Sequence, residues 1–474
     1  MKKISIYKTG IIALSAVIAV TASSCRKQLF QDPIVSLPPE AAFLTPLTVE
    51  KAAVGMYDKL QNINFFGGRV LIYVDVRGID VNPPSYFNPL PQFTQVLSNE
   101  TFTAGAWQGG YRSIGETNLF LKNLGTAQGV PAAKIAQYTA EAEFIRSLNY
   151  FYLVNMWAQP YKFTPGATHL GVPLVLTAPP VDPFDVSTQV PRATVAAIYA
   201  QIEKDLLDAE ANLPDNYADA TFSDVARATK GAAQALLARV YLYEGKYAQA
   251  SAYADKVTAS KQQYALNGDP LTAFRNFTTK ESIFSVAMNG ADNPNTNNAI
   301  GQHYNPALRG DIQVSPGYIG LMDTLKDLRY KNLITTTSKG TIFWTKKYVG
   351  TADWVPVLRY SEILLIKAEA LAMLSAGDVA DPAALALVNK VRARSNATPV
   401  VAVTKADLIS AILTERRIEL AFEGQGEFDF LRTGRGIPQH GIIGAQAYGS
   451  NNVILPIPKY DTDKNPNLVQ NPGY

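Results

Sequence analysis

Cysteine and histidine are nearly absent from this sequence. Among its 474 residues there is one cysteine, Cys25, and there are three histidines, His169, His303 and His440. A single thiol excludes an intramolecular disulfide. The histidines lie far apart, and none has a second histidine or a cysteine at ligand spacing, so a zinc site is not expected. Phosphate loops, dinucleotide fingerprints and nucleophile elbows are also missing, so we expect no metal and no cofactor.

Long apolar runs are equally scarce. The run from Gly10 to Ala22 has 13 residues, whereas a membrane-spanning helix needs about 20. Three lysines precede it, and small residues lead on to Cys25, which is typical of a signal peptide. Residues 22–25 resemble a lipobox, so we predict that residues 1–24 are removed, that Cys25 is lipidated and that residues 25–46 form an extended tether. The alternative is a plain secretory peptide with an incidental cysteine.

An excess of positive charge is missing once that segment is removed. The formal net charge of +3 includes three lysines and no acidic residue within residues 1–24. The mature chain is therefore close to neutral and has no basic excess with which to bind nucleic acid.

Helical periodicity dominates residues 47–474. Helices are predicted at Val49–Asn62, Ala106–Leu124, Ala132–Trp157, Ala193–Leu213, Arg227–Glu244, Tyr247–Ala259, Tyr360–Leu374, Pro382–Arg394 and Lys405–Phe422, and a short strand at Ser282–Ala287. The pair within residues 229–259, joined by a tight turn at Gly245, has the tetratricopeptide pattern. Because such repeats bury their apolar faces only against neighbours, residues 47–474 should form a single domain. The expected fold is mainly α, a tetratricopeptide-like right-handed helical superhelix with long irregular loops and a few short strands.

Three long irregular stretches, residues 65–105, 160–191 and 264–353, are rich in proline, glycine, asparagine and aromatic residues. Loops of this length inside a compact domain are uncommon unless they are functional. An exposed ring flanked by amide and carboxylate groups can hold a sugar face or a peptide side chain. The candidate ligand-binding residues are therefore Asp80, Tyr86, Phe87, Phe93, Tyr304, Asn305 and Trp344. The alternative is that these rings pin the loops to the repeats, and Trp107 and Trp157 are expected in the core.

A dense charged cluster occupies residues 415–423, with three carboxylates and two arginines. At helical spacing the carboxylates fall on or beside the core-facing side. We expect Arg416 to reach Glu419, and Arg417 to reach Asp429 or the preceding repeat, so that the charges join adjacent helices rather than perform acid/base chemistry.

Several motifs together carry a family resemblance. The segments 359–370, 388–394 and 415–424, with the ending at residues 455–474, resemble the SusD/RagB family of outer-membrane nutrient-binding lipoproteins. Residues 107–118 and 140–153 are similar to the first two repeat helices of that family. The resemblance covers the mature chain almost from end to end.

The resemblance implies a non-enzymatic lipoprotein on the outer membrane of a bacterium of the Bacteroidetes type, facing the cell surface. It also implies capture of an oligosaccharide and its delivery to a SusC-like TonB-dependent β-barrel transporter. Capture of a peptide is the alternative within the family. Two further alternatives remain, a surface glycosidase, which needs only two suitably placed carboxylates, and a repeat adaptor that binds another protein through its concave wall.

Overall fold

The computed structural model describes residues 42–474 apart from 94–95, 183–184 and 219. The predicted signal peptide, Cys25 and most of the tether lie outside the described residues. In chain order the helices are α2 (Pro46–Leu60), α3 (Arg69–Val76), α4 (Thr101–Leu124), α5 (Ala132–Trp157), α6 (Val195–Asn212), α7 (Ala220–Ala226), α8 (Lys230–Glu244), α9 (Tyr247–Thr258), α10 (Ile300–Tyr304), α11 (Pro316–Ile319), α12 (Leu328–Leu333), α13 (Tyr360–Leu374), α14 (Pro382–Arg394), α15 (Lys405–Leu420), α16 (Gly426–Arg432) and α17 (Lys459–Lys464). The strands are β1 (Val81–Asn82), β2 (Leu170–Pro173), β3 (Arg192–Thr194), β4 (Ser282–Val286), β5 (Gln313–Val314), β6 (Ile334–Thr336), β7 (Phe343–Thr345) and β8 (Val355–Arg359).

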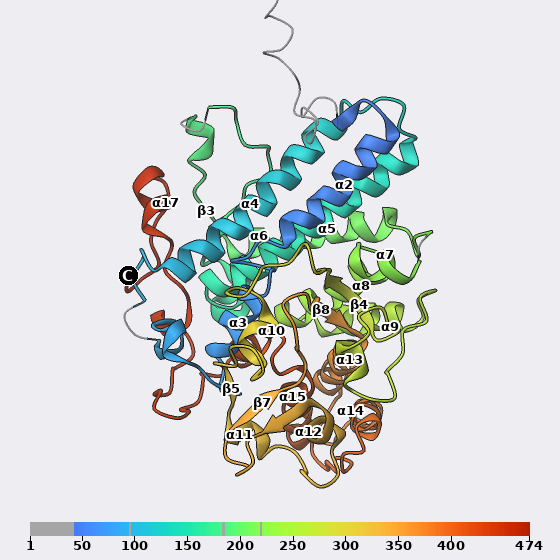
Figure 1. Cartoon of the computed structure of the whole chain (residues 1–474), viewed down its shortest axis with the longest axis vertical. Helices are drawn as coiled ribbons and strands as arrows, with labels where there is room; N and C mark the ends of the chain where they lie inside the picture. Colours follow the sequence, from blue (N-terminus) through green and yellow to red (C-terminus); the bar gives the residue numbers. More distant parts are fainter. Residues whose placement is uncertain (1–41, 94–95, 183–184, 219) are drawn as a thin grey trace, which may run out of the picture.

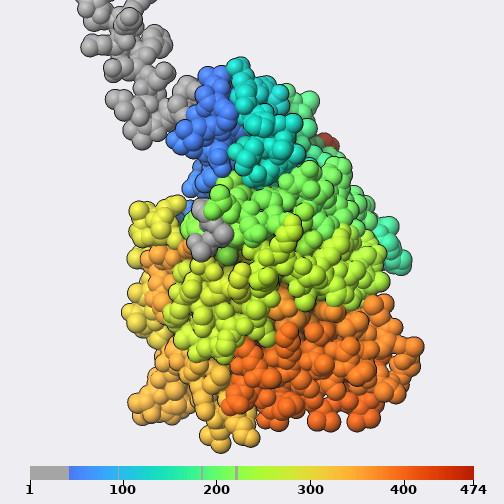
Figure 2. Space-filling model, turned by 90° about the vertical axis from the view of Figure 1, so that its right-hand side faces the viewer, coloured from blue at the N-terminus to red at the C-terminus, as the bar shows by residue number. Residues whose placement is uncertain are grey.

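The long helices pack in succession. Helix α2 packs on α4, α4 on α5, α5 on α6, α6 on α8, α8 on α9 and α9 on α13, and α13 carries both α14 and α15 (Figure 1). Figure 2 shows the same order on the surface, with the blue and cyan N-terminal helices at one end and the orange residues of the later helices at the other. This arrangement confirms the predicted mainly α, tetratricopeptide-like fold with long loops and a few short strands.

Helix ends follow local capping chemistry. In α8 the Thr229 side chain accepts a hydrogen bond from the backbone N–H of Ala232, and Gly245 ends the helix in the left-handed region with φ of 77°. Glycine tolerates that conformation without a steric penalty, which explains the tight turn into α9. Helix α15 begins with a capping box between Thr404 and Asp407. These local signals account for helix boundaries that agree with the predicted ones to within a few residues.

Helix α3 lies inside the first irregular stretch, where no helix was predicted. All eight of its residues are buried. A helix that is surrounded on every side has no polar face, and the amphipathic periodicity that reveals a surface helix is then absent. The residues at and after its C-terminal end, Arg77 and Asp80, are buried as well.

Three small antiparallel sheets brace the loops. Strands β4 and β8 pair between Ser282 and Arg359, and β2 pairs with β3. A four-stranded sheet in the order β1-β5-β7-β6 joins the first long loop to the third, with Val81 opposite Val314. Among the described residues the main hydrophobic core extends from Phe43 to Leu468, and a smaller cluster includes Phe93 and Phe430. Phe43 lies 5.7 Å from Phe120 between ring centroids, so the packed body already includes the last residues of the segment predicted as tether.

Candidate functional site

The irregular segments between the repeats meet around Tyr86. This residue lies in the short 3-10 helix Ser85–Phe87, and its side chain is 39% exposed. The guanidinium of Arg309 lies 4.1 Å from the centre of the Tyr86 ring, and the His303 ring is stacked beside it at 5.9 Å. Arg69 Nη2 donates a hydrogen bond of 3.3 Å to the Tyr86 hydroxyl, and this contact lowers the pKa of that hydroxyl. Tyr86 is therefore fixed from below and partly open to solvent.

The loop that follows α10 includes or contacts two more of the predicted residues, Asn305 and Trp344. Trp344 Nε1 donates to the carbonyl of Gly310 at 2.8 Å, directly after Arg309. Asn305 Nδ2 donates to the carbonyl of Val349 at 2.7 Å, and the Asn305 side-chain oxygen accepts from the backbone N–H of Ala307. We call the surface formed by Tyr86, Asn305, Arg309 and Trp344 the Tyr86 platform.

Charge pairing holds this loop in shape. The carboxylate of Asp311 contacts His303 Nδ1 at 2.9 Å and Arg309 Nε at 2.7 Å. The backbone N–H groups of Arg309 and Gly310 both donate to the carbonyl of Gln302. The loop is thus closed on itself, and Arg309 is positioned over the ring by a fixed carboxylate rather than by solvent.

The other predicted ligand residues lie in the interior. Phe87 and Tyr304 are 0% exposed and Phe93 is 1% exposed. Phe87 packs against Tyr73 and Phe102, and Phe93 lies under the Arg77 guanidinium at 4.4 Å. These three rings anchor the loops, so the expectation that each offers a ring face to a ligand is wrong for this conformation.

Two of the buried side chains face charged or polar partners. The hydroxyl of Tyr304 donates to Asp75 Oδ2 at 2.7 Å. Asp80 accepts a hydrogen bond from Arg417 Nε at 2.5 Å, and burial raises the pKa of Asp80 to about 6 although Arg417 opposes the shift. Asp80 therefore joins the first long loop to the C-terminal helix α15 instead of orienting a ligand.

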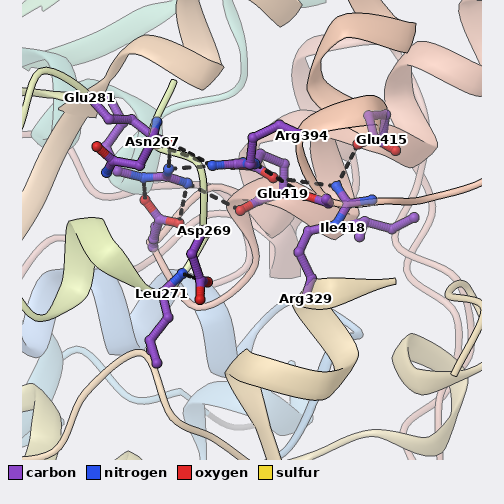
Figure 3. A network of polar contacts seen from close by, with 12 residues as sticks. Asn267, Asp269, Leu271, Glu281, Arg329, Arg394, Glu415, Ile418 and Glu419 are labelled. Carbon is purple, nitrogen blue, oxygen red and sulfur yellow. Dashed lines mark hydrogen bonds and ion pairs between the residues drawn. The ribbon is translucent and has the colours of Figure 1, made fainter. Parts of the chain in front are cut away.

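The charged cluster at residues 415–423 forms enclosed ion pairs with other elements of the fold. Figure 3 shows Arg329 beside Glu415 and Arg394 beside Glu419. Arg394 also contacts Glu281, the residue before β4. These side chains are at most 4% exposed. Enclosed ion pairs of this kind join α15 to α12, α14 and β8, in agreement with the prediction that these charges join adjacent elements.

The individual arginine pairings differ from the expected ones. Arg416 pairs with Asp429 at 2.9 Å, and Arg417 pairs with Asp80 instead of Asp429. Neighbouring residues on a helix point about 100° apart, so Arg416 faces α16 while Arg417 faces the first long loop. Sequence spacing alone could not decide which of the two arginines turns inward.

Asp75 and Glu427 are carboxyl groups with raised pKa values, and both are enclosed. Burial raises the pKa of Asp75 to about 8 and that of Glu427 to about 7. Asp75 accepts hydrogen bonds from Tyr304 and from the backbone N–H of Gly424, and Glu427 accepts from Arg77 Nε. Both residues are less than 7% exposed, so a sugar cannot reach either group in this conformation.

Arg69, His303 and Arg309 were not foreseen as site residues. Arg69 belongs to the unpredicted helix α3, and Arg309 is one of many arginines with no motif around it. Among the described residues no group of three His, Cys, Asp or Glu side chains could hold a metal ion. Within the same part of the chain, no helix is both long and apolar enough to cross a membrane.

Comparisons with known proteins agree with the fold. The SusD family model matches residues 316–474, and a second model, described as starch-binding associating with outer membrane, matches residues 49–242. A SusD-like protein of Formosa agariphila is 26% identical, and the alignment covers 100% of both chains. A SusD-like protein of Bacteroides ovatus is 24% identical over 73% of this chain and 69% of its own.

Solved structures give the same result. A SusD superfamily protein from Bacteroides vulgatus is similar with a TM-score of 0.80 and 27% identity, covering 91% of this chain and 100% of its own. A laminarin-binding SusD-like protein is similar with a TM-score of 0.72 and 26% identity, at the same coverage. Two family models that match different parts of the chain, full-length relatives and a shared fold lead to one conclusion. The chain belongs to the SusD/RagB family.

Proposed function

We propose that this protein is a lipid-anchored, glycan-binding protein of the outer membrane that captures an oligosaccharide at the cell surface without cleaving it. The observation that carries the proposal is the Tyr86 platform, whose central ring is partly exposed, hydrogen-bonded by Arg69 and contacted by the Arg309 guanidinium. The family description of starch binding at the outer membrane and the laminarin-binding structural relative support the same ligand class. Cys25 supplies the lipid anchor in this proposal.

The chemistry of the platform suits a neutral sugar. Sugar rings have an apolar face that packs on an aromatic ring, while their hydroxyls exchange hydrogen bonds with fixed polar groups at its edge. Arg309 is exposed and covers one face of Tyr86. A bound sugar would lie against this side chain, which Asp311 holds in place, so guanidinium donors remain beside the ring.

The ligand is expected to bind with modest affinity. The platform is open and offers two partly exposed rings, so only part of a sugar is desolvated. Gains from a few stacked contacts and hydrogen bonds must offset the ordering cost, which gives a Kd on the order of micromolar to millimolar.

The proposal is tested by titrating the Cys25→Ala form of the mature chain with laminarin and starch oligosaccharides, and with a peptide library. We expect oligosaccharide binding without release of shorter products. Tyr86→Ala and Trp344→Ala should each weaken binding by about tenfold, the equivalent of roughly 1.4 kcal/mol. Phe163→Ala is the matched control, because Phe163 is also 39% exposed and its ring packs against His169 and Tyr448, which are not platform residues.

Each alternative gives a different result in that titration. Accumulation of shorter sugars would favour the glycosidase, and peptide binding that depends on Tyr86 would favour the peptide-capturing member of the family. Binding of no small ligand would favour the repeat adaptor. Oligosaccharide affinity that is equal in the Tyr86→Ala, Trp344→Ala and Phe163→Ala proteins would contradict the platform.

Delivery to a SusC-like TonB-dependent β-barrel transporter completes the proposal. The lipid anchor would keep the binding protein beside such a barrel, and a captured sugar would then have a high local concentration at its entrance. Affinity purification of the membrane-anchored protein should recover the transporter in stoichiometric amount. Recovery of the protein alone from gently solubilised membranes would contradict the partnership.

A further inference from the structure

A concave site lined by none of the platform residues lies at the beginning of α4. It is a cavity of about 700 Å³ between the first half of α4, the end of β2, residues 188–190 and helix α17. Figure 1 shows α17 beside β3 and the beginning of α4. The volume falls within the range of roughly 300–1,000 Å³ that is usual for small-molecule sites.

Three aromatic residues line this cavity. Trp107 and Tyr111 come from α4, with 4.8 Å between their ring centroids, and Tyr460 comes from α17. Trp107 is supported from behind by Trp157 at 5.3 Å. Tyr460 is 59% exposed, and an exposed ring at the mouth of a cavity offers a flat face on which a ligand can pack.

A buried carboxylate oxygen in the wall lacks a partner. Asp461 lines the cavity, and among the described residues its Oδ2 atom has no hydrogen-bond partner although it is buried. Burial raises the pKa of Asp461, and a hydrogen bond from the Trp107 side chain to this carboxylate opposes the shift, so the Oδ2 atom alone is short of a donor. A buried acceptor without a donor is uncommon and costs free energy, so this oxygen is suited to receive a donor from a ligand.

The walls are already held in place. The hydroxyl of Tyr111 donates to the carbonyl of Pro173 at 2.8 Å. Asn465 donates to the carbonyl of Val190, and Asn467 donates to that of Gln189. The C-terminal segment is therefore tied to the opposite loop without a ligand, and a preformed site loses little ordering entropy when it binds.

This cavity is separate from the Tyr86 platform. Phe102, on α4, packs beneath Tyr86 with 5.4 Å between ring centroids. Trp107 follows Phe102 by five residues, which places the two side chains about 140° apart around the helix. The two sites thus use different faces of α4 and can bind independently.

We propose that this Trp107 cavity is a second carbohydrate-binding site that takes a short, neutral oligosaccharide. A sugar ring packs on Tyr460, and a sugar hydroxyl donates a hydrogen bond to Asp461 Oδ2. The inward carboxylate disfavours anionic ligands, and the Lys464 ammonium at the same wall disfavours cationic ones. A neutral polyhydroxyl ligand satisfies the carboxylate without introducing an unpaired charge.

The experiment is calorimetric titration of the Cys25→Ala form with laminarin and malto-oligosaccharides, with stoichiometry as the primary measurement. We expect two molecules bound per chain for at least one probe. Tyr460→Ala and Asp461→Asn should each weaken one of the two binding events by at least about tenfold and leave the other unchanged. Tyr86→Ala should weaken the remaining event, so the two sites are distinguished. Asp463→Asn is the control, because its carboxylate pairs with Lys459 and does not line the cavity.

A crystal structure with the tightest-binding probe gives the second measurement. We expect a sugar ring against Tyr460 and a hydroxyl within hydrogen-bond distance of Asp461 Oδ2. A stoichiometry of one or none for every probe would overturn the proposal, as would equal affinities in the Tyr460→Ala, Asp461→Asn and Asp463→Asn proteins. A complex with sugar at Tyr86 and only water in the Trp107 cavity would overturn it while leaving the proposed function intact.

Discussion

Glu419 stands at the centre of the most heavily charged part of the interior, and replacing it with glutamine should strongly destabilise the fold. Among the described residues, five carboxylates and five cations form one connected ion-pair network, in which every side chain is at most 17% exposed. Its members are Glu281, Asp327, Arg329, Lys347, Arg359, Arg392, Arg394, Glu415, Glu419 and Glu423. The charges balance, so removal of one carboxylate leaves an uncompensated buried cation.

The hydrogen bonds of Glu419 determine how much stability the Glu419→Gln substitution should remove. Glu419 accepts from Arg394 at 2.5 Å, from Arg329 at 3.3 Å and from Arg359 at 3.4 Å. Burial alone would raise the pKa of Glu419, but the three guanidinium groups outweigh burial and hold this pKa below its ordinary value. Breaking a buried pair by removing one partner costs about 3–5 kcal/mol. Glu419→Gln keeps the shape of the side chain, so this cost should appear almost entirely as lost electrostatic stabilisation.

Urea unfolding at pH 7, followed by tryptophan fluorescence, measures the free energy of unfolding of both proteins. Because the pKa of Glu419 is lowered in the folded state, its stabilisation is complete above its ordinary pKa of 4.5 and is lost as the pH falls below that value. The difference between the two proteins should therefore shrink in acid. The surface pair Lys204–Asp208, 66% and 53% exposed, supplies the control Asp208→Asn, which should cost well under about 1 kcal/mol. Equal losses in the Glu419→Gln and Asp208→Asn proteins would refute the reasoning.

Three further outcomes are expected. Cys25→Ala should move the protein from the membrane fraction to a soluble fraction, and unchanged membrane association on cell fractionation would refute the lipid anchor. The pKa of Asp75 is raised by burial from 3.8 to about 8, so the folded state retains a proton that the unfolded state loses, and stability falls as the pH rises between these values. Thermal melts from pH 4 to 9 should show a smaller fall of the melting temperature with rising pH in Asp75→Asn than in the unchanged protein. An unchanged pH dependence would assign this fall to another group. In Gly301→Ala the new Cβ would meet the carbonyl oxygen of Gly350 at 2.1 Å, so α10 should shift at a cost of about 1–3 kcal/mol. The shift of α10 should also weaken oligosaccharide binding. A Gly301→Ala variant that retains both stability and affinity would show that α10 tolerates the contact with the Gly350 carbonyl.

The repeat helices could be predicted because their signals are local. The bounds of α5, α13 and α14 agree with the predicted ones residue for residue. Caps such as the Asp381 side chain, which accepts from the backbone N–H of Ala384, and the apolar spacing of each helix are readable without knowledge of the neighbours. The stacking order then follows, because consecutive antiparallel helices with short connections pack together.

The candidate site could be predicted only in part, because exposure depends on distant contacts. Tyr86 and Phe87 are adjacent in the sequence, yet one is 39% exposed and the other is 0% exposed. Phe87 turns toward Tyr73 on helix α3, an element that the periodicity did not reveal. The same limit applies to Arg309, whose position over Tyr86 depends on Asp311 and on the closure of its loop.

Helix α3 and the residues just after it explain why the platform and the C-terminal helices belong to one structure. Arg69 donates to Tyr86, Asp75 accepts from Tyr304, and Asp80 accepts from Arg417 on α15. One buried segment therefore fixes the ligand loops on one side and the charged C-terminal region on the other. Rings on long loops would otherwise lose much binding energy to ordering. Because that ordering is already complete in the fold, substitutions that loosen α3 should reduce the affinity of the proposed platform for an oligosaccharide, although no residue of α3 belongs to the platform.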